Sequence, residues 1–136
     1  MSGKNVALLK RWFDEVWNQK RIGAIAEMAS PECIAHGQAQ HDVTMGLAQF
    51  EQFALTLQTS FPDMHVEFDF AFEQDDKVVA RWTATMTHTG EFLEFAPTGR
   101  QAKVTGTTVA RIADGKIVEG WDSWNAGGLV RRLADE

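Results

Sequence analysis

The chain has 136 residues, enough for one domain with its own hydrophobic core and too few for two. It carries 13 Lys and Arg against 19 Asp and Glu, a formal net charge of −6, which argues against a nucleic-acid partner or an anionic membrane surface. A single cysteine excludes a disulfide framework, and no apolar run approaches the roughly 20 residues of a membrane helix. The N-terminal segment carries charges and does not resemble a signal peptide, so we expect a cytoplasmic protein.

The first third of the chain is predicted to be helical. Apolar residues at spacings of three and four predict a helix over about 4–19, and a short second helix follows it and ends before Pro31. We expect a short strand over 33–36, then a polar loop, and then a third helix over 47–61.

From residue 64 the apolar period changes from 3.6 to 2, which is typical of half-buried antiparallel strands. The strands are predicted over 66–73, 78–88, 101–113 and 116–125, with a hairpin turn at Asp114-Gly115 between the last two. In the first of them the apolar face consists of Val66, Phe68, Phe70 and Phe72.

This order of elements predicts an α+β fold for a single domain spanning residues 1–136. We expect a curved antiparallel sheet wrapped around the helices as a cone, and a cone lined by aromatic rings encloses a ligand pocket. The expected ligand is a small apolar or aromatic molecule.

Asp122 is the leading candidate for chemistry. The period of two places it on one face with Val118, Gly120 and Trp124, and with Gly106, Thr108 and Ala110 of the neighbouring strand. A carboxyl group among rings loses hydration, which raises its pKa and suits it to move protons near neutral pH. The alternative is that Asp122 points outward and its two neighbours in sequence fill the core, since a shift of one residue reverses the faces.

The aromatic residues are expected to build both the core and the pocket wall. The chain has nine Phe and five Trp but no Tyr. The predicted lining consists of Phe13, Trp17, Phe50, Trp82, Met86, Phe92 and Trp124.

His36 ends a short strand near the expected mouth of the cone, and His88 shares the face of Trp82. Either imidazole could position a carbonyl or relay a proton, although a lone histidine on an apolar face is more often a packed core residue. No ligand pair has metal-site spacing, so no metal is expected.

Several segments resemble one known family. Its first helix resembles LLKRWFDEVWNQ, its helix-to-sheet junction resembles FPDMHVEF, and its long strand resembles VVARWTATMTHTGEF. Its closing hairpin resembles FAPTGRQAKVTGTTVARIADGKIVEGWDSWN, and its C-terminal turn resembles GGLVRRL. Over about residues 5–133 the chain is therefore similar to the SnoaL-like polyketide cyclases of the nuclear-transport-factor-2-like superfamily, whose cone is also called a cystatin-like barrel.

The resemblance implies ring closure by intramolecular aldol condensation without metal or cofactor, with an aspartate of the final strand as acid/base. Counted from the shared DGKI hairpin, that aspartate matches Asp122. An active-site histidine of some members matches Thr108, and a polar pocket residue matches His36. The resemblance thus implies that Asp122 and His36 are catalytic and that Thr108 lies at the substrate. His88 is expected to help bind the substrate because of its place on the face of Trp82 and Met86. The resemblance also implies a homodimer paired through the convex face of the sheet.

Other functions remain open on the same cone. A non-catalytic module for small apolar ligands would explain why Thr108 replaces a histidine, and a related isomerase or lyase would use the same aspartate. Ketosteroid-isomerase-like chemistry is disfavoured because it needs a phenol. Epoxide-hydrolase-like hydrolysis is disfavoured because Arg81-Trp82-Thr83 lacks an Arg-x-Asp pair. A protein-interaction domain would need exposed apolar residues on the convex face, whereas the sequence predicts a Thr-rich one.

Overall fold

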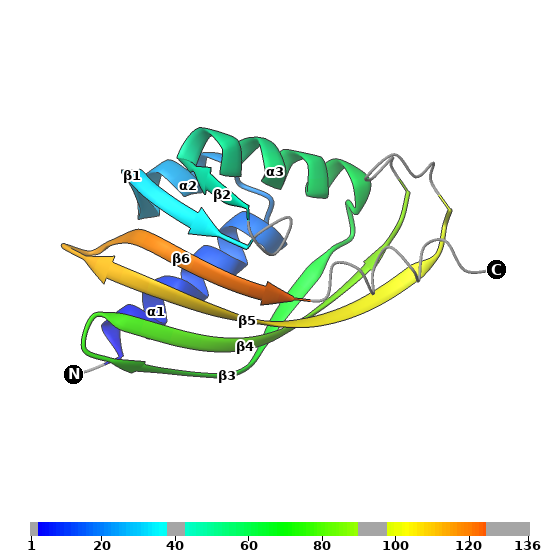
Figure 1. The fold of residues 1–136 in the computed structure, drawn as a ribbon. Helices are drawn as coiled ribbons and strands as arrows, with labels where there is room; N and C mark the ends of the chain where they lie inside the picture. The colour runs from blue at the N-terminus through cyan, green and yellow to red at the C-terminus, as the bar shows by residue number, and fades with distance from the viewer. Residues whose placement is uncertain (1–2, 38–42, 90–97, 125–136) are drawn as a thin grey trace.

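The structure is a computed structural model that describes residues 3–37, 43–89 and 98–124, and it combines a curved sheet with helices on its concave side (Figure 1). The helices are α1 (Lys4–Trp12), the π-helix η1 (Phe13–Asn18), α2 (Gly23–Met28) and α3 (Leu47–Ser60). The strands are β1 (Ala29–His36), β2 (Thr44–Gly46), β3 (His65–Gln74), β4 (Lys77–Thr87), β5 (Gln101–Ala113) and β6 (Lys116–Trp124). The expected α+β fold is confirmed.

The strands of the sheet lie in the order β2-β1-β6-β5-β4-β3. Neighbouring strands are antiparallel except β1 and β6, which are parallel. β1 begins at Ala29, earlier than the strand predicted over 33–36, because Ala29 pairs with Ile117 of β6. β2 lies in a segment predicted as loop. Both differences come from pairing between segments that are distant in sequence, which local patterns do not reveal.

The first predicted helix is correct in position but changes type along its length. The α-helical pattern ends at Trp12, and a π-helix follows in which the backbone N–H of Gln19 donates to the carbonyl of Asp14, at 2.7 Å. A π-helix is wider than an α-helix and is often found at functional sites. Its turns bury Phe13, Val16 and Trp17 against the sheet.

β3 contains a β-bulge that the sequence did not predict, and it changes which side chains of the strand face inward. Phe68 pairs with Trp82, but Phe70 pairs with the next residue back, Arg81, so Asp69 is an extra residue in the strand. A bulge of this kind exchanges the two faces of all later residues. The expectation that Phe70 and Phe72 share the inner face is therefore wrong, and these side chains are 58% and 54% exposed.

A second bulge shifts the start of β6. Ile112 pairs with Ile117, whereas Arg111 pairs with Glu119, so Val118 has no partner of its own in β5. Ile117 is buried at that position, and the prediction that Val118 lies on the inner face is wrong. Beyond the bulge, the predicted alternation that places Asp122 on the inner face holds.

Gly106 of β5 makes room for a tryptophan. It pairs with Trp82 of β4, whose indole ring lies across the glycine. A Cβ atom at this position would lie 2.4 Å from Cζ2 of Trp82 and 2.9 Å from Cβ of Trp124, which is closer than such atoms pack. The ring of Trp82 can therefore occupy its place only because residue 106 has no side chain.

We predict that Gly106→Ala destabilises the protein by about 1–3 kcal/mol, since the new methyl group must displace a buried ring. Gly120→Ala is the matched control on the neighbouring strand, because a Cβ there would approach nothing closer than 3.9 Å. Urea unfolding of both variants measures the difference. Equal stability of the two variants would contradict the packing described for Trp82.

Candidate active site

A chain of hydrogen bonds crosses three strands of the inner face. Thr108 of β5 pairs with Asp122 of β6, and its hydroxyl donates to Oδ1 of the carboxylate at 2.5 Å. The indole Nε1–H of Trp82 donates to the same hydroxyl oxygen at 2.9 Å. Because an indole nitrogen can only donate, the Thr108 hydrogen is directed toward Asp122. Trp82 and Thr108 are 8% and 7% exposed, so the hydrogen bond between them is shielded from water, while Asp122 is half-buried.

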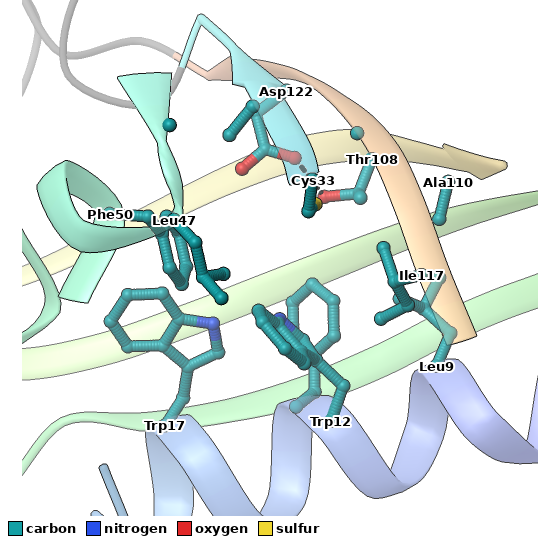
Figure 2. A pocket seen from close by; sticks show the side chains of 14 residues that line it. Leu9, Trp12, Trp17, Cys33, Leu47, Phe50, Thr108, Ala110, Ile117 and Asp122 are labelled. Atoms are coloured by element: carbon teal, nitrogen blue, oxygen red, sulfur yellow. Dashed lines mark hydrogen bonds between the residues drawn. The ribbon is translucent and has the colours of Figure 1, made fainter. Parts of the chain in front are cut away.

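Two pockets meet at this carboxylate. The first, which we call the β1 pocket, has a cavity volume of about 50 Å³, and Cys33 of β1 lies in its wall (Figure 2), as does Ala35. The second, the β4 pocket, has a cavity volume of about 60 Å³ and includes Ala84 and Met86 of β4 in its wall. Asp122 lines both, and Figure 2 shows its side chain across the β1 pocket from Trp12 and Trp17. It is the one carboxylate among the described residues that line them.

Most of the predicted site residues surround these two pockets. Those that line one or both are Phe13, Trp17, Phe50, Trp82, Met86, Thr108, Asp122 and Trp124. Phe92 lies outside the described residues. The agreement follows from the inward alternation of the strands and from the helix stripe that packs against them.

The structure does not place His88 in either pocket. The residue is fully buried just beyond the end of β4, where its ring packs 5.5 Å from that of Phe61. Its Nδ1 atom lies 3.1 Å from the Thr98 hydroxyl oxygen. His88 therefore lies outside the two pockets, and its predicted role in ligand binding stays a prediction.

His36 is also absent from the pockets, because it lies on the opposite face of the sheet. Its Nε2 atom is 2.7 Å from Oε2 of Glu119, and its ring stacks on that of Trp121 at 5.5 Å. The hydrogen bond from His36, together with a second one from Arg111, lowers the pKa of the Glu119 carboxyl group. His36 therefore lies outside the two pockets, and its predicted catalytic role stays a prediction.

β1 contributes Cys33 and Ala35 to the wall of the β1 pocket, which was not predicted from the sequence. Cys33 and Ala35 face the pocket while Ile34 and His36 face outward, which the period of two already implies for this short strand. Burial raises the pKa of the Cys33 thiol to about 11, with a smaller contribution from the negative charge of Glu119. The thiol is therefore neutral near pH 7 and acts as an apolar wall group.

In the described part of the chain, neither a metal-binding cluster nor a membrane-spanning helix is found. Within residues 3–37, 43–89 and 98–124, no three His, Cys, Asp or Glu side chains gather where they could hold a metal ion. None of the helices in these ranges is long and apolar enough to cross a membrane.

We predict that Cys33, the single cysteine, is alkylated by iodoacetamide at pH 8 at least about 100-fold more slowly in the folded protein than in guanidinium. Burial disfavours the charged thiolate, so with a pKa of about 11 only about one thiol in a thousand is reactive at that pH. Mass spectrometry follows the reaction. Similar rates in the folded and unfolded protein would show that the wall of the β1 pocket is open to solvent.

Comparisons with known proteins agree with this geometry. The model of the SnoaL-like polyketide cyclase family matches residues 7–133. AclR from Streptomyces galilaeus, a proposed hydroxylase, is 28% identical with a TM-score of 0.86, and the match covers 98% of this chain and 86% of that one. A proposed SnoaL-like polyketide cyclase from Jannaschia sp. CCS1 is 24% identical with a TM-score of 0.87, over 98% and 93% of the two chains.

A nuclear-transport-factor-2-like protein from Burkholderia pseudomallei K96243 is 16% identical with a TM-score of 0.77, over 99% and 100% of the two chains. Similarity at this level of identity supports the fold alone. No curated protein matches the sequence. The match to the family model over nearly the whole length, on a cone of the same fold, shows that the chain belongs to the SnoaL-like polyketide cyclase family.

Proposed function

We propose that the protein is a cofactor-independent enzyme that closes a ring in an apolar carbonyl substrate by intramolecular aldol condensation. The observation that carries the proposal is the Asp122 carboxylate, held by Thr108 at the junction of two apolar pockets. A related isomerase or lyase reaction would begin with the same proton transfer. We further propose that the protein works in the cytoplasm, on the grounds of its sequence.

In the proposed reaction the Asp122 carboxylate removes a proton from a carbon next to a carbonyl group. The resulting enolate carbon attacks a second carbonyl carbon of the same molecule, which forms the new C–C bond and leaves an alkoxide. The protonated Asp122 then returns its proton to the alkoxide oxygen. Every atom and charge balances within substrate and carboxyl group, so the step needs neither metal nor oxidant.

The surroundings of Asp122 favour this use. The Thr108 hydroxyl and the Trp82 indole fix the orientation of one carboxylate oxygen through the two hydrogen bonds described above. The apolar walls exclude water and hold the two reacting carbons near each other, which contributes several kcal/mol when the geometry is good. The enolate charge would be delocalised best in an extended, polyketone-like substrate.

We predict that Asp122→Asn lowers the rate of cyclisation at least about 100-fold on a panel of poly-β-ketone mimics, because an amide cannot accept the proton. Asp69→Asn is the matched control, since this carboxylate bonds Thr83 and is exposed at the bulge of β3. Product formation is followed by liquid chromatography and mass spectrometry. An unchanged rate in Asp122→Asn would exclude the acid/base role. Binding without turnover by the wild type would favour the alternative of a non-catalytic binding module.

Hydroxylation is a second candidate, and the similarity to AclR favours it. A hydroxylated product gains the mass of one oxygen atom from dioxygen, while the second oxygen atom leaves as water with two electrons and two protons from an external reductant. An aldol product keeps the mass of its substrate, or loses that of one water molecule. The same mass spectra therefore distinguish the two reactions, and an anaerobic control separates them independently.

We also propose that two copies pair through the convex face of the sheet. The strand register places Phe72, Val79, Val109 and Trp121 in one row across four strands. With Phe70 and Phe72 more than half exposed, this face is less polar than the Thr-rich surface that the sequence predicted. An apolar row of this kind suits a self-complementary interface around a two-fold axis.

We predict that the wild type sediments as a dimer and that Phe72→Glu shifts it toward monomer, because the new charges would be buried against each other. Leu55→Glu is the matched control, since Leu55 is also an exposed apolar residue, 41% accessible, but lies on α3. Analytical ultracentrifugation at micromolar concentration measures both. A monomeric wild type, or an equal effect of the two substitutions, would contradict the proposed interface.

A further inference from the structure

The carboxylate of Asp122 lies at the junction between two spaces rather than at the end of one. The β1 pocket and the β4 pocket have three described residues in common, namely Phe13, Trp17 and Asp122. Phe13 and Trp17 come from the π-helix η1, and Asp122 comes from β6 of the sheet. A molecule that places its reacting carbon at Asp122 therefore has open space on two sides.

Away from this junction the walls of both pockets are mostly apolar, and different residues provide them. Among the described elements, α1 and β1 contribute to the β1 pocket, β4 contributes to the β4 pocket, and α3 contributes to both. In the β1 pocket the apolar residues include Leu9, Trp12, Ala35, Leu47 and Phe50. In the β4 pocket they include Phe53, Leu57, Ala84, Met86 and Val104. Among the lining residues in the described part of the chain, Asp122 is the one charged group. Polar atoms of a ligand are therefore best placed at the centre, and its ends are best apolar.

We propose that the substrate is a neutral carbonyl compound with two apolar lobes, one for each pocket, and with its acidic C–H between them at Asp122. The proposal rests on the acid/base function proposed above, which requires the reacting carbon to reach the carboxylate. A second negative charge at the junction would be repelled by Asp122 and would lose its hydration without compensation. This disfavours ligands whose polar centre is itself a carboxylate or a phosphate.

A pair of ketones tests the two-lobed shape. 1,3-Diphenyl-2-propanone has a central carbonyl, acidic C–H groups and a phenyl ring on each side, whereas 1-phenyl-2-butanone has a single ring. Since burial of an additional ring contributes through its apolar area, we expect the two-ring ketone to bind at least about tenfold more tightly. Isothermal titration calorimetry measures both affinities.

Substitutions that fill one pocket at a time locate the two rings. Ala35→Leu reduces the space of the β1 pocket alone, and Ala84→Leu reduces that of the β4 pocket alone. If either protein is unstable, Leu47→Trp and Val104→Phe replace them, because these residues also line one pocket each. Circular dichroism melting curves establish that each variant is folded before it is titrated.

We expect each filled pocket to reduce the affinity for the two-ring ketone about tenfold, to near that of the one-ring ketone. The one-ring ketone should keep its affinity in both variants, since its ring can enter whichever pocket remains. If filling one of the pockets leaves the affinity for the two-ring ketone unchanged, the two-lobed proposal is wrong. Equal affinities of the two ketones for the wild type would also overturn it.

The Asp122→Asn variant separates this proposal from the acid/base function. It keeps the two apolar pockets, so we expect it to retain the tenfold preference for the two-ring ketone. A retained preference without any turnover by the wild type would support the two lobes and contradict the catalytic role. Turnover that needs Asp122, combined with no preference between the two ketones, would support the catalytic role and contradict the two lobes.

Discussion

The hydrogen bond from Thr108 to Asp122 is the interaction on which the rest of the site depends. It attaches the carboxylate to the neighbouring strand, and the indole N–H of Trp82 fixes the direction of the hydroxyl that makes it. Gly106 in turn provides the space for that indole ring. The orientation of Asp122 is thus set by paired strands rather than by a loop, which is the more rigid way to support a functional group. Gly37 lies next to this strand, and a Cβ atom there would clash with the backbone oxygen of Asp122, so the two segments can approach each other only because residue 37 has no side chain.

This arrangement also explains why a carboxylate can be tolerated among aromatic walls. A buried charge without a hydrogen-bond partner is strongly unfavourable, and the Thr108 hydroxyl supplies a partner on the sheet side. The open space on the other side leaves room for a ligand between the sheet and the rings of Phe13 and Trp17. One face of the sheet therefore carries the candidate site, while His36, Glu119 and the exposed phenylalanines lie on the other.

Much of the fold could be predicted from the sequence, because the helix and strand periods are regular over long segments and the hairpin at Asp114-Gly115 has a clear local signal. The inward position of Asp122 could also be predicted, since β6 is regular from Glu119 onward. The errors arise where one residue changes the register. The bulge at Asp69 turned Phe70 and Phe72 outward, and nothing in the local pattern marks it. The outward direction of His36 follows from the alternation of its own strand, in which Cys33 and Ala35 face the β1 pocket.

Deuterium incorporation shows whether Asp122 exchanges a proton with a carbon next to a carbonyl group. 1,3-Diphenyl-2-propanone is incubated in D₂O near neutral pH with the wild type and with Asp122→Asn, and NMR follows the loss of its benzylic protons. We predict that the wild type accelerates the exchange well above the rate in buffer and that the exchange with Asp122→Asn proceeds at the buffer rate. Equal acceleration by the two proteins would contradict it.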